Sequence, residues 1–237
     1  MVLPVETFDP SEAIVPLLGI DHSDKARVLG KHVFLGTGVF VGQRPLLATA
    51  EHAIRGWDGA FAITTTRNPD QILRARLLTA DREADLALLE VPGHPAEKAL
   101  PLAQDSEITL NQTVFCLEYS STYSQGKVMH LSPATRLGNV TRVVDLTHRY
   151  GKAGEDALEL SFPALRGASG APVVSGALRV WGIVIANVSY HLLPSQITIV
   201  LDERNQILEE TQFLLPLGVA VHVRHLRGMV ESLQSGA

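Results

Sequence analysis

Apolar and polar residues alternate over short runs along most of this chain, and turn-forming residues separate the runs. The runs are rich in valine, isoleucine and threonine and are bounded by glycine, proline, asparagine and aspartate, which predicts β-strands. Many short strands with turns between them favour a sandwich or a barrel. We predict strands over 33–35, 39–41, 61–66, 72–79, 85–91, 113–119, 140–147, 157–162, 180–188, 196–201 and 214–223.

Helical periodicity is scarce, so the predicted fold class is all-β. The best helix is C-terminal, over 223–233, where apolar residues recur at steps of three and four residues. One helical turn is expected over 52–55. The polar segment 96–107 is predicted to be a crossover between two halves of the fold, and 119–126 a mobile loop.

Composition and charge narrow the range of function. The 237 residues are 46% hydrophobic and 19% charged, which is typical of a globular protein. The formal net charge is −5 and no basic run occurs, so we expect no nucleic-acid partner. No apolar stretch reaches the about 18 residues of a membrane-spanning helix, so no membrane partner is expected.

The N-terminus and the single cysteine bear on the compartment. The first residues lack a basic start followed by a long apolar run, so no signal peptide is predicted. Cys116 is the one cysteine of the chain and lies in a predicted strand, where it is expected to be a small core residue. We therefore expect a reducing cytoplasmic location.

Three short segments contain the residue types of an acyl-transfer site. They are 49–53 (Thr-Ala-Glu-His-Ala), 85–89 (Asp-Leu-Ala-Leu-Leu) and 167–172 (Gly-Ala-Ser-Gly-Ala-Pro). A serine hydroxyl is a weak nucleophile, so it needs a base, and the base needs an orienting carboxylate. We predict that Ser169 is the nucleophile, His52 the base and Asp85 the orienting residue. Little side-chain bulk surrounds Ser169, so the N–H groups of Gly167 and Ser169 are expected to form an oxyanion hole.

These segments resemble the trypsin-like (chymotrypsin-fold) serine peptidases, most nearly their bacterial HtrA/Deg-like branch. The resemblance covers about residues 30–230 and includes 36–42 (Gly-Thr-Gly-Val-Phe-Val-Gly) and 181–184 (Trp-Gly-Ile-Val). It implies two six-stranded antiparallel β-barrels followed by a short C-terminal helix, with the three residues in the cleft between the barrels. The implied domains are 1–105, which contains His52 and Asp85, and 106–237, which contains Ser169.

The sequence departs from the family pattern beside the serine. Ala171 stands where the family usually has glycine, and we expect its methyl group to be tolerated. Ala168 stands where digestive proteases have aspartate, so activation by pairing that aspartate with a new N-terminal amine is not expected. The PDZ modules of HtrA proteins are not expected in this sequence either.

The resemblance also implies a substrate pocket. Its base is assigned to Pro163 and Ala164, and its walls to Ile185, Ala186, Asn187 and Gly218. A trypsin-type pocket has aspartate at the base, where this chain has Pro163. A buried substrate cation would therefore lack a partner, which costs several kcal/mol. We expect cleavage after small or medium apolar residues.

The resulting hypothesis is a serine endopeptidase that needs no cofactor or metal and acts on a protein or peptide substrate. An ungated protease would harm its cell, so control by a regulatory protein partner and a role in bacterial stress or defence are expected. The alternatives are a catalytically silent trypsin-like binding or scaffold module and an esterase of the same fold.

Other interpretations of single residues are weaker. An α/β-hydrolase elbow requires glycine at the position of Ala171. His222 and His225 lack an evident third metal ligand, so structural roles are expected. Asp81 is assigned to a solvated turn and Glu51 to the surface.

Overall fold

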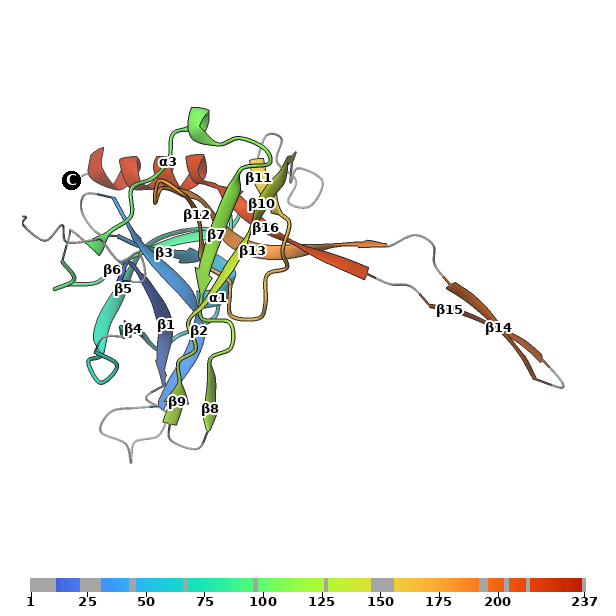
Figure 1. The fold of residues 1–237 in the computed structure, drawn as a ribbon. Coiled ribbons are helices and arrows are strands. Elements are labelled where there is room, and N and C mark those ends of the chain that lie inside the picture. Colours follow the sequence, from blue (N-terminus) through green and yellow to red (C-terminus); the bar gives the residue numbers. More distant parts are fainter. Residues whose placement is uncertain are drawn as a thin grey trace, which may run out of the picture.

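The computed structural model describes residues 12–21, 31–42, 46–65, 68–95, 98–125, 128–145, 156–191, 196–202, 205–211 and 214–235. The first of two closed antiparallel barrels has the strand order β1-β2-β3-β6-β5-β4 (Figure 1). Its strands are β1 (Ile14–Asp21), β2 (Lys31–Val41), β3 (Leu46–Ala50), β4 (Ala60–Ile63), β5 (Leu73–Asp81) and β6 (Leu86–Glu90).

The second closed barrel has the strand order β10-β11-β16-β13-β12-β7. The predicted all-β class and the two six-stranded barrels are therefore confirmed. The strands of the second barrel are β7 (Thr113–Glu118), β10 (Ala134–Asp145), β11 (Asp156–Leu160), β12 (Pro172–Ser175), β13 (Val180–His191) and β16 (Leu214–His222).

The pattern of apolar and polar residues did not predict β3 (Leu46–Ala50), because both faces of this strand are buried. In β3, Leu46 and Ala48 belong to a core cluster that continues into the second barrel, whereas Leu47 packs into a separate cluster inside the first barrel. All five residues of β3 are buried, so the alternation that marks a half-exposed strand is absent. Burial of a leucine-sized side chain contributes about 1.5–3 kcal/mol. Strands β1 and β12 were missed as well.

Two hairpins lie outside the barrels. β8 (Tyr123–Gln125) pairs with β9 (Val128–His130), and the rings of Tyr123 and His130 stack with centroids 4.8 Å apart. The prediction of a loop over 119–126 was therefore wrong for its second half, because a cross-strand aromatic pair supports a short hairpin there. β14 (Gln196–Asp202) pairs with β15 (Asn205–Thr211), and Figure 1 shows this hairpin extending away from both barrels.

The helices are short. α1 (Glu51–Ile54) follows β3, one residue earlier than predicted, and the 3₁₀ turn η3 (Asp105–Glu107) lies in the described part of the crossover between β6 and β7. α3 (Val223–Ser235) confirms the predicted C-terminal helix. Arg227 of α3 donates to the carbonyl of Ala103 and to Asp105, both at 2.7 Å. The hydrogen bond from Arg227 is the main reason that the pKa of Asp105 is lowered.

Candidate active site

The pairing of β3 with β6 sets the geometry of the first two site residues. Ala50 lies opposite Leu86, so α1, which follows β3, meets the turn that precedes β6. The backbone N–H of His52 donates to Asp85 Oδ1 at 2.8 Å, and His52 Nδ1 lies 2.6 Å from Asp85 Oδ2. A carboxylate only accepts, so Nδ1 carries the imidazole proton and Nε2 is left as an acceptor.

Ser169 comes to this pair from the second barrel, in the loop before β12. Its Oγ lies 2.8 Å from His52 Nε2. Asp85 is 7% exposed, whereas the His52 side chain is 35% exposed. The carboxylate is thus shielded from water while the imidazole and the hydroxyl can be reached from solvent. The structure brings the three residues of the predicted triad into one continuous hydrogen-bonded arrangement.

The loop around Ser169 adopts a backbone that requires glycine. Gly167 has φ +97° and Gly170 has φ +87°, both in the region that favours glycine. A Cβ on Gly170 would lie 2.0 Å from the carbonyl oxygen of Thr37 and 2.2 Å from Thr49 Oγ1. The close approach of this loop to the first barrel therefore depends on Gly170.

Two N–H groups of the loop have no partner among the described residues, so each can donate to an anion. The N–H of Ala168 donates to Leu165 O at 2.9 Å, and that of Gly170 donates to Val184 O at 2.8 Å. The N–H groups of Gly167 and Ser169, which alternate with these, have no hydrogen-bond partner among the residues described. They are the two donors predicted for the oxyanion hole.

The two alanines beside Ser169 are packed into the core. Ala168 and Ala171 are both fully buried. The carbonyl of Ala168 accepts the N–H of Ala171 at 2.8 Å, and the carbonyl of Ala171 accepts the N–H of Val184 at 2.8 Å. The methyl group of Ala171 fits within the core cluster without breaking these hydrogen bonds.

The residues assigned to the substrate pocket come from segments that are in contact. Asn187 Nδ2 donates to Ala164 O at 2.6 Å, and its Oδ1 accepts the N–H of Ala164 at 2.7 Å. Asn187 lies opposite Gly218 in the β13–β16 pair, and the N–H of Gly218 donates to Phe162 O at 2.7 Å. The Asn187 amide therefore spans from β13 to the segment that contains Pro163 and Ala164. Ile185 and Ala186 precede it on β13.

Two acidic residues near the triad have different surroundings. Asp81 is exposed, and its carboxylate accepts the N–H groups of Glu83 and Ala84, as a turn residue would. The assignment of Glu51 to the surface was wrong, because this residue is 5% exposed. Arg55 Nε donates to its carboxylate at 2.7 Å, and Arg82 Nε lies 3.5 Å from it. These two ion pairs make burial of Glu51 possible next to His52.

Thr37 is a site residue that the sequence pattern did not predict. It is fully buried, and its N–H donates to Ser169 O at 2.9 Å. Its hydroxyl donates to Gly167 O at 3.0 Å. Gly36 and Gly38, which flank Thr37, belong to a motif quoted for the family resemblance. Nothing in the sequence pattern indicated that the hydroxyl between them contacts the loop that contains Ser169.

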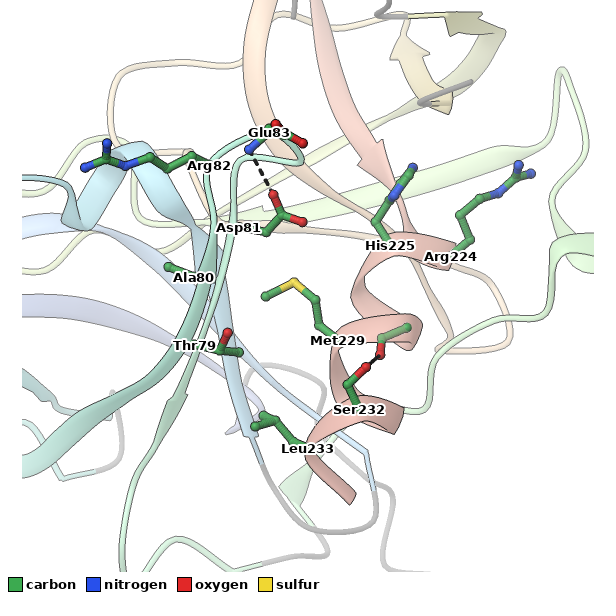
Figure 2. Close-up of a pocket in the computed structure, with 11 residues that line it drawn as sticks. Thr79, Ala80, Asp81, Arg82, Glu83, Arg224, His225, Met229, Ser232 and Leu233 are labelled. Atoms are coloured by element: carbon green, nitrogen blue, oxygen red, sulfur yellow. Dashed lines mark hydrogen bonds between the residues drawn. The ribbon is translucent and has the colours of Figure 1, made fainter. Parts of the chain in front are cut away.

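One cavity of the described residues is separate from the triad. It has a volume of about 810 Å³ and lies between the turn after β5 and helix α3 (Figure 2). Asp81 and His225 contribute polar groups to it, and Met229 and Leu233 contribute apolar ones. No triad residue lines it.

His222 and Cys116 are both buried. His222 is 3% exposed, and its Nδ1 accepts the N–H of Arg224 at the start of α3, which agrees with the structural role expected for it. Burial raises the pKa of the Cys116 thiol. Among the described residues, no group of three potential metal ligands occurs, and no helix is long and apolar enough to cross a membrane.

Comparisons with known proteins agree with the fold. A family model described as a trypsin-like peptidase domain matches residues 36–183. A search of curated proteins found no match.

Several solved structures are similar to this chain in fold. The HtrA-type protease AlgW with a decapeptide has a TM-score of 0.65 at 15% identity, covering 95% of this chain and 65% of that one. AlgW with a tripeptide has a TM-score of 0.62 at 16% identity, covering 94% of this chain and 60% of that one. The inactive form of Rv3671c from M. tuberculosis, in which one serine is changed to alanine, has a TM-score of 0.59 at 18% identity, covering 100% of this chain and 99% of that one. This chain spans less than two thirds of either AlgW chain.

Proposed function

Because this chain belongs to the trypsin-like peptidase family, we propose that it is a serine endopeptidase with Ser169, His52 and Asp85 as its triad. One observation carries the proposal. His52 Nδ1 lies 2.6 Å from the Asp85 carboxylate while His52 Nε2 lies 2.8 Å from Ser169 Oγ. Both ring nitrogens are thus engaged in the geometry that general-base activation of a serine requires.

Acylation follows from this geometry. Ser169 Oγ attacks the carbonyl carbon of the scissile bond, and its proton passes to His52 Nε2. The carbonyl oxygen becomes an anion, which the N–H groups of Gly167 and Ser169 stabilise. The Asp85 carboxylate stabilises the imidazolium without taking its proton. His52 then protonates the leaving amine as the carbon–nitrogen bond breaks, and the acyl group remains on Ser169.

Deacylation repeats the sequence with water as the nucleophile. His52 Nε2 takes a proton from the water while its oxygen attacks the ester carbon. The same two N–H groups stabilise the second oxyanion. Return of the proton from His52 to Ser169 Oγ releases the carboxylic acid and restores the enzyme. No step requires a metal or an organic cofactor.

Peptides are the proposed substrate class. Two of the similar structures are AlgW bound to peptides, which supports extended peptide binding in a fold of this kind. Control by a partner protein, a role in bacterial stress or defence and a cytoplasmic location remain predictions.

Cleavage of a peptide library by the purified protein, mapped by mass spectrometry, tests the proposed function. Peptide products are expected. Turnover of esters without turnover of peptides would favour the esterase alternative, and a folded protein that cleaves neither would favour a silent binding module.

Replacing Asn187 with glycine is expected to widen the substrate pocket. The Asn187 amide bridges to Ala164, and we expect it to limit the depth available to the residue before the scissile bond. Removing it should shift the ratio of kcat/KM for phenylalanine over alanine at that position by about tenfold or more, the scale on which apolar pockets discriminate. The ratio is measured on paired synthetic peptides.

Asn139→Gly is the matched control. Asn139 is also a strand asparagine whose amide donates to a backbone carbonyl, that of Asn111 at 2.8 Å. The substrate ratio should not change in this variant. An unchanged ratio in Asn187→Gly, or a dominant preference of the unmodified protein for arginine or lysine, would contradict the pocket assignment.

A further inference from the structure

Thr37 connects the first barrel to the loop that contains Ser169. It lies in β2, is fully buried, and takes part in four hydrogen bonds. Its N–H donates to Ser169 O (2.9 Å) and its hydroxyl to Gly167 O (3.0 Å). The hydroxyl oxygen accepts the N–H of Tyr119 (3.1 Å), and the carbonyl accepts the hydroxyl of Thr49 (2.8 Å). The Thr37 hydroxyl therefore acts as a hydrogen-bond donor and as an acceptor at the same time.

The hydroxyl of Thr37 holds the peptide unit that lies between the two oxyanion donors. One donor is the N–H of Gly167 and the other is that of Ser169. The peptide unit that links residues 167 and 168 is held at both ends, its carbonyl by Thr37 Oγ1 and its N–H by Leu165 O. Rotation of this unit would turn the two donors away from each other. Fixing its carbonyl therefore fixes the angle at which they converge.

We propose that Thr37 is a positioning residue, whose hydroxyl orients the Gly167 and Ser169 donors toward the transition-state oxyanion. The inference rests on the proposed function, because it concerns the oxyanion hole of that reaction. Thr37 touches neither the substrate nor the reacting atoms, so its effect passes through the loop. The pocket assigned to residues 163–164, 185–187 and 218 comes from other segments, so we expect ground-state binding not to depend on the hydroxyl.

Thr37→Val tests this inference because valine keeps the shape of threonine and removes the hydroxyl. We expect kcat for peptide hydrolysis to fall about 10- to 100-fold with KM within about twofold, because misaligned donors act on the transition state. The inhibition constant of a peptide aldehyde, whose adduct with Ser169 bears the oxyanion, should rise in parallel. Thr37→Ser restores the hydroxyl and should recover kcat to within about threefold. Should the valine variant not fold, Thr37→Ala is expected to give the same split.

Thr64→Val is the matched control for loss of a buried hydroxyl. Thr64 is 3% exposed, and its Oγ1 donates to the carbonyls of Asn68 and Pro69, which lie between β4 and β5. The thermal stability of the Thr64→Val variant should fall, while its kcat stays within about twofold of the value for the unmodified protein.

The outcomes separate the inference from the proposed function. An active unmodified protein whose Thr37→Val variant keeps its kcat, or whose Thr37→Ser variant is equally impaired, would overturn the inference alone. A kcat loss in Thr64→Val as large as that in Thr37→Val would also overturn it. An unmodified protein that is folded but neither cleaves peptides nor reacts with the aldehyde at Ser169 would overturn the proposed function and this inference with it.

Discussion

Ser169→Ala is expected to lower kcat for peptide hydrolysis by about 10⁶-fold, the scale on which loss of a triad nucleophile acts. The variant lacks the Oγ that lies 2.8 Å from His52 Nε2, so no acyl-enzyme can form. Stability should change by no more than about 0.5 kcal/mol, because one small, partly exposed hydroxyl is removed. The purified variant is assayed for peptide turnover and for thermal unfolding.

Ser232→Ala provides the control for removal of a serine hydroxyl elsewhere. Ser232 is exposed on α3, where its Oγ donates to Gly228 O at 2.8 Å. The peptide turnover of the Ser232→Ala variant should equal that of the unmodified protein. Undiminished peptide turnover by Ser169→Ala would show that another residue is the nucleophile.

Asp85→Asn is expected to lower kcat by about 10⁴-fold while the fold is retained. Asp85 Oδ1 accepts the backbone N–H of His52, so the amide oxygen of asparagine takes this place. The amide NH₂ group then faces Nδ1, where the carboxylate oxygen lies at 2.6 Å. Donation from the NH₂ group to Nδ1 places the imidazole proton on Nε2, which can no longer accept the proton of Ser169. Steady-state kinetics on a peptide substrate measure the loss.

Asp81→Asn is the matched control, because Asp81 lies four residues earlier, at the end of β5. Its Oδ1 accepts two backbone N–H groups, and an amide oxygen can do the same. We expect kcat within a few-fold of the unmodified protein. A loss in Asp81→Asn comparable to that expected for Asp85→Asn would mean that the wrong aspartate has been assigned.

The fold could be predicted where strands have one exposed face or recognisable turns. The C-terminal helix was predicted because Leu226 and Val230 lie on one face, and the structure buries both. β3 was missed because Leu46 and Leu47 enter two different cores, so no alternation exists to detect. The β14–β15 hairpin was half predicted, since residues 205–211 mix apolar and acidic residues without a regular period.

The triad residues could be named from the sequence because each lies in a short motif that its chemistry requires. The structure brings those three together. Thr37 and the bridge from Asn187 to Ala164 could not be predicted in this way. Both depend on contacts between residues far apart in the chain, Thr37 with Gly167 and Asn187 with Ala164. Burial of Glu51 was missed because one of its two arginine partners, Arg82, reaches it only where the turn after β5 meets α1.

Labelling with a fluorophosphonate, followed by peptide mapping, tests the central claim most directly. The reagent forms a covalent adduct with a serine that an adjacent base activates, and leaves ordinary serines unmodified. We predict one adduct per chain, located on Ser169, and no adduct in the folded Ser169→Ala variant. A folded, unmodified protein that remains unlabelled, or one labelled at another residue, would contradict the proposal that Ser169, His52 and Asp85 form a working catalytic triad.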